Sequence, residues 1–352
     1  MIHFFTKISN NPVNLEFNKE LEKIGVDYRC FGALIPFEYR SRVLYLLIWY
    51  PKMAYHAFRL AVKSLILSKP HPTTVVHETD VDVLVFSFVR LFLPWKKPKI
   101  VYLTFIFTRR SSPLYQKLRI MYYRFVLSRC VKIICHSENE IALYAETFPS
   151  IADRFEFLPL GMNVGGWRNI SIDPIADDLK SRRLRVLSVG RSGRDYPTLA
   201  AAVAGEEFDV TVVCDSGEAL RGLRETDTIK ILRDCYDADY FAQLRSCDVM
   251  VVPLAVENIS QGQMVVVQAM AYGKPIVVTR TPTICHYLVD GVEALMVPLG
   301  DASALRAALR RLRDDPDLYQ RLRWAAREGY VKRHSLAVYT KHLVAAIEKI
   351  SA

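Results

Sequence analysis

Short runs of β-branched and aromatic residues alternate with longer stretches of helical periodicity along most of the chain. In the first half the strand-like runs are IHFFT, VDYRCF, TTVVH, KIVYLTF, VKIICHS and FEFLPL. In the second half they are LRVLSVG, FDVTVVC, TIKIL, DVMVVPL, PIVVT and ALMVPL. Because near-continuous apolar strands separated by helices are typical of parallel sheets buried on both faces, the pattern predicts two doubly wound, Rossmann-like α/β domains.

The break between the halves falls near PLGMNVGGWRN, residues 159–169, where glycines and a proline interrupt the pattern. We therefore expect a first domain over 1–165 and a second over 166–352, facing each other across a cleft. The second domain ends in helical stretches that run to near Ile350. One arrangement this allows is that the last helix packs back on the first domain.

Composition limits the class of protein. With 352 residues, 51% of them hydrophobic, the chain is long enough for two domains that each bury a core. The seven cysteines are spread without a CxxC pair, which is typical of reduced thiols in a cytoplasmic protein. The start of the chain lacks a signal-peptide pattern, and no uncharged apolar run reaches the ~18 residues of a membrane span.

The net charge of +10 is concentrated in the first half, because 16 lysines and arginines lie between Ser41 and Lys132 against three acids. These basic residues are interleaved with aromatic residues and leucines, a mixture that suits an anionic membrane surface. The alternative is an ordinary solvated basic face on buried helices. We expect no nucleic-acid partner, since no recognised binding motif accompanies the charge.

The loop SVGRSGRDYPTLAAAV, residues 188–203, follows a predicted strand and precedes a predicted helix. Gly190 and Gly193 loosen the turn, and Arg191 and Arg194 enter it. Glycine lets a backbone approach a phosphate closely, while a helix N-terminus and guanidinium groups supply positive charge. The loop therefore predicts a diphosphate site, and the alternative is a surface turn with solvated arginines.

The stretch ISQGQMVVVQAMAYGKPIVV, residues 259–278, predicts a buried helix with a polar start. Ser260 and Gln263 fit a capping box. Gly262 in the first turn costs about 1 kcal/mol relative to alanine, a cost that makes sense if a ligand lies against the backbone. Gln268 projects an amide from an apolar helix and needs a partner, either neighbouring protein or ligand hydroxyls such as those of ribose.

These two stretches, followed by YLVDGVEALMVPLGDASAL, resemble the second domain of family-four retaining glycosyltransferases of the GT-B fold over about residues 183–330. In that family this domain binds the nucleotide-sugar donor. The resemblance implies that Arg191 binds the diphosphate and that Gln268 takes a ribose-contacting position that is glutamate in the family. The family's second basic residue and first glutamate have no clean match; Arg194 is the substitute for the former, and Ser260 lies at the position of the latter.

The loop LRDCYDADYF, residues 232–241, lies along the nucleobase in similar proteins, which makes Cys235 and Tyr236 candidates to flank it. The alternative is that Asp237 caps the following helix. The resemblance also places Gly262, Gln263 and Met264 in the loop whose amides meet the sugar and the β-phosphate. The catalytic and donor-binding residues expected on this basis are Arg191, Arg194, Gly190, Cys235, Tyr236, Ser260, Gly262, Gln263, Met264, Val265 and Gln268.

In the first domain, polar residues that follow predicted strands are candidates to bind the acceptor or to act as a base. Turn formation, an exposed basic face or a structural histidine would explain the same residues. The candidates are Asn11, Glu78, Thr108, Arg109 and His136. Because no DxD pair or other carboxylate cluster of the sequence suggests a bound metal, we expect no metal and no cofactor.

The function expected from the sequence is transfer of one sugar, with retention, from a nucleotide-sugar donor to a lipid-linked or polysaccharide acceptor. This is hexosyltransferase-type chemistry of bacterial-type glycan biosynthesis, carried out on the inner face of the cytoplasmic membrane. The leaving diphosphate can assist the reaction on the same face, so the protein has to stabilise its charge. Alternatives are a sugar-nucleotide epimerase of GT-B-like fold and a non-catalytic nucleotide-sugar-binding module.

Overall fold

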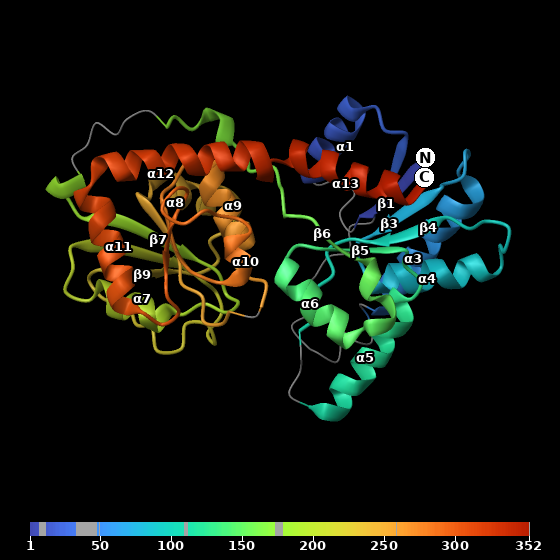
Figure 1. Cartoon of the computed structure of the whole chain (residues 1–352), viewed down its shortest axis with the longest axis horizontal. Coiled ribbons are helices and arrows are strands. Elements are labelled where there is room, and N and C mark those ends of the chain that lie inside the picture. Colours follow the sequence, from blue (N-terminus) through green and yellow to red (C-terminus); the bar gives the residue numbers. More distant parts are fainter. Residues whose placement is uncertain are drawn as a thin grey trace. The chain divides into compact units, whose positions relative to one another are not determined.

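The computed structural model describes residues 1–352 except 7–11, 33–47, 49, 109–111, 173–178, 258 and 352. The chain forms two compact units, one made of Met1–Leu158 with Leu336–Ala352 and the other of Pro159–Ser335. Each unit is built on a six-stranded sheet in which every pair of neighbouring strands is parallel. Helices flank each sheet (Figure 1), as doubly wound α/β folds require.

The sheet of the first unit has the order β2-β1-β3-β4-β5-β6. Its strands are β1 Ile2–Thr6, β2 Tyr28–Gly32, β3 Thr74–His77, β4 Lys99–Tyr102, β5 Lys132–Cys135 and β6 Phe155–Phe157. Its main helices are α1 Pro12–Ile24, α3 Tyr50–Val62, α4 Asp80–Leu91, α5 Pro113–Leu127, α6 Glu138–Thr147 and α13 Leu336–Ser351. All four residues of β3 are buried, as expected for a strand in a sheet that is covered on both faces.

The last helix, α13, belongs to the first unit although it ends the chain. Its residues Leu343, Val344 and Ile347 are buried in one cluster with Ile2 and Phe4 of β1. Burying side chains of this size contributes roughly 1.5–3 kcal/mol each, so α13 is a full part of this core. The structure therefore divides the chain after Leu158 and again before Leu336.

The sheet of the second unit has the order β12-β11-β10-β7-β8-β9. Its strands are β7 Leu184–Val189, β8 Phe208–Val213, β9 Ile229–Leu232, β10 Val249–Val252, β11 Ile276–Thr279 and β12 Leu295–Val297. Its α-helices are α7 Tyr196–Val203, α8 Asp237–Ser246, α9 Gln263–Ala271, α10 Pro282–Cys285, α11 Ala302–Asp314 and α12 Pro316–Gly329.

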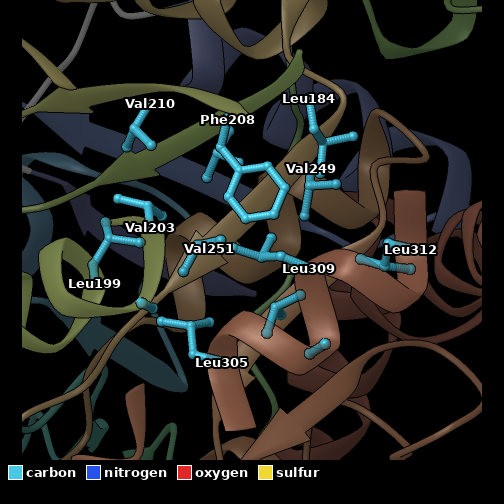
Figure 2. Close-up of a cluster of buried hydrophobic side chains, with 14 of the residues drawn as sticks. Leu184, Leu199, Val203, Phe208, Val210, Val249, Val251, Leu305, Leu309 and Leu312 are labelled. Carbon is cyan, nitrogen blue, oxygen red and sulfur yellow. The ribbon is translucent and has the colours of Figure 1, made fainter. Parts of the chain in front are cut away.

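One face of this second sheet is covered by a stripe of leucines from α11. Leu305, Leu309 and Leu312 recur at helical spacing and are buried against Phe208 and Val251 of the sheet (Figure 2). Every strand-like run predicted from the sequence overlaps a strand of the structure, so the predicted fold class of two parallel α/β sheets is confirmed. Several strands are shorter than their runs; β4 ends before Thr104, whose φ of 63° leaves the extended conformation.

A buried carboxylate fastens the start of β7 to β10. Asp248, 3% exposed, accepts hydrogen bonds from the guanidinium groups of Arg182 (2.6 and 2.8 Å) and Arg185 (2.8 Å). The backbone N–H of Arg185 also donates to it at 2.8 Å. Burial acts to raise the pKa of this carboxyl, but the hydrogen bonds from both arginines outweigh it and lower the pKa to about 2.

Among the described residues, no helix combines the length and the apolar character needed to cross a bilayer.

Candidate functional site

The second unit holds a cavity of about 390 Å³ at the carboxyl ends of three neighbouring strands. Val189, Val213 and Leu232, the last residues of β7, β8 and β9, lie in its wall. The opposite wall comes from the first turns of α8 and from α9. In open α/β sheets, ligands bind at this edge of the sheet, because the loops there leave room between strand ends and helix starts.

The glycine-rich turn after β7 takes a shape that only glycine adopts readily. Gly190 has a φ of 127° and Gly193 a φ of 58°. A Cβ at Gly190 would lie 2.5 Å from Nη2 of Arg194, and one at Gly193 would lie 1.6 Å from Oε1 of Gln261. Glycine is therefore required at both positions by the close approach of other side chains as well as by the positive φ.

Arg194 stabilises this turn through hydrogen bonds to two backbone carbonyls. Its Nε donates to the carbonyl of Val189 at 2.9 Å and its Nη1 to the carbonyl of Ser192 at 3.0 Å. The residue is 9% exposed, and its burial lowers the pKa of the guanidinium. Arg194 is absent from the cavity wall, so its position does not support the predicted role as a catalytic, diphosphate-binding residue.

Arg191 lies at the cavity with its side chain 71% exposed. Its Nη1 lies 3.8 Å from Oδ2 of Asp215, which also accepts a 2.5 Å hydrogen bond from the hydroxyl of Tyr236. This hydrogen bond, and to a smaller extent the charge of Arg191, lowers the pKa of Asp215. Sequence reasoning missed Asp215, although its place just after the strand β8 would have identified it.

The start of α9 differs from the predicted capping box. The N-cap is Gly262, with a φ of 88° and no side-chain capping hydrogen bond, and the helix begins at Gln263. The side-chain amide of Gln263 donates to Oγ of Ser260. A Cβ at position 262 would lie 3.3 Å from Val252, so both the backbone conformation and the packing favour glycine here. The capping-box prediction was wrong, because the N-cap is Gly262 and not Ser260, and Gly262 makes no side-chain capping hydrogen bond.

Backbone hydrogen bonds join the glycine-rich turn to the segment that leads into α9. The N–H of Ala255 donates to the carbonyl of Gly193, and the N–H of Asp195 donates to the carbonyl of Pro253, each at 3.0 Å. The side chain of Gln261 lies against Gly193. Two motifs that are far apart in the sequence are thus fixed side by side within one unit.

The α9 helix contributes Met264 and Gln268 to the cavity wall. Met264 is 56% exposed. The Oε1 of Gln268 accepts a 2.7 Å hydrogen bond from the hydroxyl of Tyr240, a buried residue of α8. The amide that the sequence required to be paired therefore has a protein partner, which fixes the carboxamide in the wall.

The α8 helix begins after Tyr236, its N-cap residue, so Asp237 is the first helical residue and does not take the N-cap position considered above. Cys235 and Tyr236 both line the cavity, and Tyr236 is 55% exposed. The cavity wall carries the carboxylates of Asp215, Asp234 and Asp237 and the guanidinium of Arg191. Carboxylates accept hydrogen bonds from hydroxyl and N–H groups, so this acidic wall suits an uncharged nucleoside better than an anionic group.

The structure thus brings together only part of the predicted donor site. The predicted residues that line the cavity are Gly190, Arg191, Cys235, Tyr236, Met264 and Gln268. Those that lie outside its wall are Arg194, Ser260, Gly262, Gln263 and Val265. Within the described residues, no group of three or more His, Cys, Asp or Glu side chains is placed to hold a metal ion.

In the first unit, His136 lies just after β5. Its Nδ1 is 2.8 Å from the carbonyl oxygen of Leu158, and its Nε2 is 3.1 Å from the hydroxyl of Thr104. Burial lowers the pKa of the imidazole. With both ring nitrogens paired, His136 has the position of a structural histidine, which does not support the predicted role as a base.

The other first-domain candidates are only partly described. Glu78 directly follows β3 and is half-buried. The carbonyl of Thr108 accepts a 2.6 Å hydrogen bond from Arg119 of α5. Asn11 and Arg109 lie outside the described residues.

Comparison with known proteins agrees with this geometry. Residues 184–315, which contain the whole cavity wall, match the family described as Glycosyl transferases group 1. Anabaena HepE, solved in complex with UDP, is 13% identical with a TM-score of 0.66, and the match covers 99% of both chains. The chain has the GT-B fold.

Two further solved structures have this GT-B fold. Sucrose-phosphate synthase from Thermosynechococcus elongatus is 18% identical with a TM-score of 0.70, over 99% of this chain and 98% of that one. WaaG, a glycosyltransferase involved in lipopolysaccharide biosynthesis, is 14% identical with a TM-score of 0.61, over 97% and 98%. No curated protein sequence matches the chain. The resemblance predicted from residues 183–330 is confirmed by the matched family and these folds.

Proposed function

We propose that the chain is a glycosyltransferase that takes one sugar from a nucleotide-sugar donor bound in the second unit. The observation that carries the proposal is the cavity at the ends of β7, β8 and β9, inside the segment that matches Glycosyl transferases group 1. Its acidic wall, with Asp215 and Asp234, would meet the hydroxyl and N–H groups of the nucleoside. The diphosphate would lie toward Gly190, Arg191 and the start of α9.

The start of α9 supports this placement of the diphosphate. A helix of nine residues carries partial positive charge at its N-terminus, and its N-cap residue, Gly262, supplies no side-chain cap. Arg191, exposed at the same cavity, would add a full positive charge. Charge that grows on the leaving diphosphate would then be stabilised by groups already in place.

In more detail, we propose that the enzyme transfers a hexose with retention and without a metal ion. The acceptor would be lipid-linked or a polysaccharide. Retention follows from the family resemblance, in which the leaving diphosphate assists on the same face. Metal independence is carried over from the sequence analysis, in which no DxD pair or other carboxylate cluster suggests a bound metal. Activity lost with a chelator and restored by manganese would contradict it.

We also propose that the enzyme works in the cytoplasm on the inner face of the cytoplasmic membrane. The first unit exposes large apolar side chains next to basic ones, among them Phe92 (69%) and Trp95 (72%) beside Lys96 and Lys97. Such a surface would insert rings between anionic lipid headgroups while its lysines meet their charges. Flotation with anionic liposomes should be strong at low salt and weak at high salt. No binding at low salt would contradict the proposed membrane association.

The donor proposal is tested by binding and by transfer. UDP, GDP, ADP and their sugar derivatives are screened by thermal shift, and one nucleotide family should raise the melting temperature. That donor is then incubated with membrane extract, and the anomeric configuration of the product is read by NMR. Binding without any transfer or release of nucleotide would indicate a non-catalytic module, and conversion of the donor without acceptor would indicate an epimerase.

A further inference from the structure

The first unit contains two adjoining cavities among α3, α4 and α5 that the donor site does not use. The larger has a volume of about 670 Å³ and the smaller about 290 Å³. Leu84 and Val85 of α4 belong to the walls of both. The walls of the two cavities therefore share one turn of α4.

The larger cavity is lined by aromatic rings that carry hydroxyl groups. Tyr50, Tyr115, Tyr122 and Tyr123 lie in its wall, and the hydroxyl of Tyr122 donates to Oδ2 of Asp80 at 2.9 Å. Rings of this kind offer an apolar face with a polar edge, and a carboxylate accepts hydrogen bonds from hydroxyl groups. This combination suits a neutral polyhydroxyl group such as a sugar ring.

Among the described residues that line the larger cavity, Arg119 is the one cation, and it is already engaged. Arg119 donates to the carbonyl of Thr108 at 2.6 Å, and its guanidinium lies 4.8 Å from the ring centroid of Phe107. An anionic group would thus meet Asp80, and the described part of the wall holds no free cation to neutralise it. The larger cavity therefore favours an uncharged head group.

The smaller cavity has an apolar wall. Besides Leu84 and Val85 it is lined by Phe88, Leu91 and Phe125, which remain 57%, 69% and 53% exposed. At its edge the guanidinium of Arg129 lies 4.6 Å from the ring centroid of Phe125. Large apolar side chains that stay exposed around a hollow mark a place where an apolar partner binds.

We propose that the two cavities form one site for an amphiphilic acceptor, with its sugar in the tyrosine-lined cavity and its hydrocarbon chain in the apolar cavity. The inference rests on the proposed function for the site's role in transfer. The order of the two cavities, polar next to apolar with a shared wall, is what a glycolipid requires. A water-soluble polysaccharide would leave the apolar cavity unfilled.

The test uses the full chain without donor and two probes that share a head group. Octyl glucoside, kept below its critical micelle concentration, and methyl glucoside are titrated by isothermal calorimetry. Octyl glucoside should bind at least ~100-fold more tightly, since each buried methylene strengthens binding by about fourfold. Equal affinity of the two probes would overturn the proposal.

Matched leucines separate this site from general surface hydrophobicity. Leu91 is 69% exposed and lines the apolar cavity, whereas Leu114 of α5 is 70% exposed and lines neither cavity. Leu91→Gln should weaken octyl glucoside about tenfold and Leu114→Gln should leave it unchanged. Equal losses in both variants would show unspecific adsorption and overturn the proposal.

A third variant tests the binding of the sugar head group. Asp80→Asn should weaken octyl glucoside about tenfold, the loss expected for a hydrogen bond to a charged group, and leave 1-octanol unchanged. Loss of 1-octanol binding as well would overturn the assignment of the sugar to this cavity. If octyl glucoside binds as described but no nucleotide does, the proposed function fails and the acceptor site stands. If sugar transfer is measured and Leu91→Gln behaves like Leu114→Gln, the acceptor site fails and the proposed function stands.

Discussion

Arg191→Ala should lower kcat/KM for the nucleotide-sugar donor about 100-fold without changing stability. The ion pair with Asp215 is 3.8 Å long and the Arg191 side chain is 71% exposed, so the pair contributes little to folding. In the transition state the same guanidinium would face the charge that grows on the leaving diphosphate. Removing one such preorganised partner costs about 100-fold or more in rate.

The assay follows release of the nucleoside diphosphate at donor concentrations well below KM, with the melting temperature measured on the same preparations. Arg224→Ala is the matched control, because Arg224 is an exposed arginine of the same unit outside the cavity wall. Arg191→Lys should recover part of the rate, since lysine keeps the charge but loses the planar fork. Unchanged kinetics in Arg191→Ala would show that the diphosphate lies elsewhere.

Acid, backbone strain and a lost hydroxyl each give a further test. Because the folded pKa of Asp248 is about 2 against an ordinary 3.8, its stabilisation of about 2 kcal/mol is present above about pH 4 and lost as pH falls toward 2. Urea unfolding at pH 3 and 6 should show about half of this loss in the wild type and a smaller change in Asp248→Asn. Gly193→Ala should lower the free energy of unfolding by about 1–2 kcal/mol because of its φ of 58°, whereas Gly217→Ala, with open space at its Cβ, should not. Tyr240→Phe removes the donor to Gln268 and should weaken nucleotide binding about five- to tenfold in a calorimetric titration, and an unchanged affinity would place the ribose away from this amide.

The strands could be predicted from the sequence because a parallel strand covered on both faces has to be apolar at nearly every position. The run DVMVVPL predicted β10 to within two residues at either end, and all four residues of that strand are buried. The grouping of loops could also be predicted, since loops after parallel strands meet at one edge of a sheet. This rule is why Gly190, Cys235 and Met264 meet at one cavity.

The direction of individual side chains could not be predicted. Arg191 and Arg194 belong to the same short turn, yet one is exposed at the cavity and the other is buried under the turn. The difference arises from two backbone carbonyls that happen to face Arg194, and residue spacing does not encode it. The same limit explains the capping box, because Ser260 and Gln263 have its spacing while the φ of 88° at Gly262 moves the helix start.

The geometry of the donor cavity depends mainly on main-chain groups, and this bears on the residues that depart from the family pattern. The turn after β7 is tied to the segment before α9 by the backbone of Gly193 and Pro253, so the identity of residue 268 does not set that geometry. Glutamine at this position changes what the wall offers a ribose, from acceptors alone to a donor and an acceptor. With Oε1 of Gln268 taken by Tyr240, the carboxamide nitrogen is the group with which this side chain would meet ribose oxygens. The substitution would thus reverse the direction of one ribose hydrogen bond while the cavity proposed to hold the nucleotide keeps its shape.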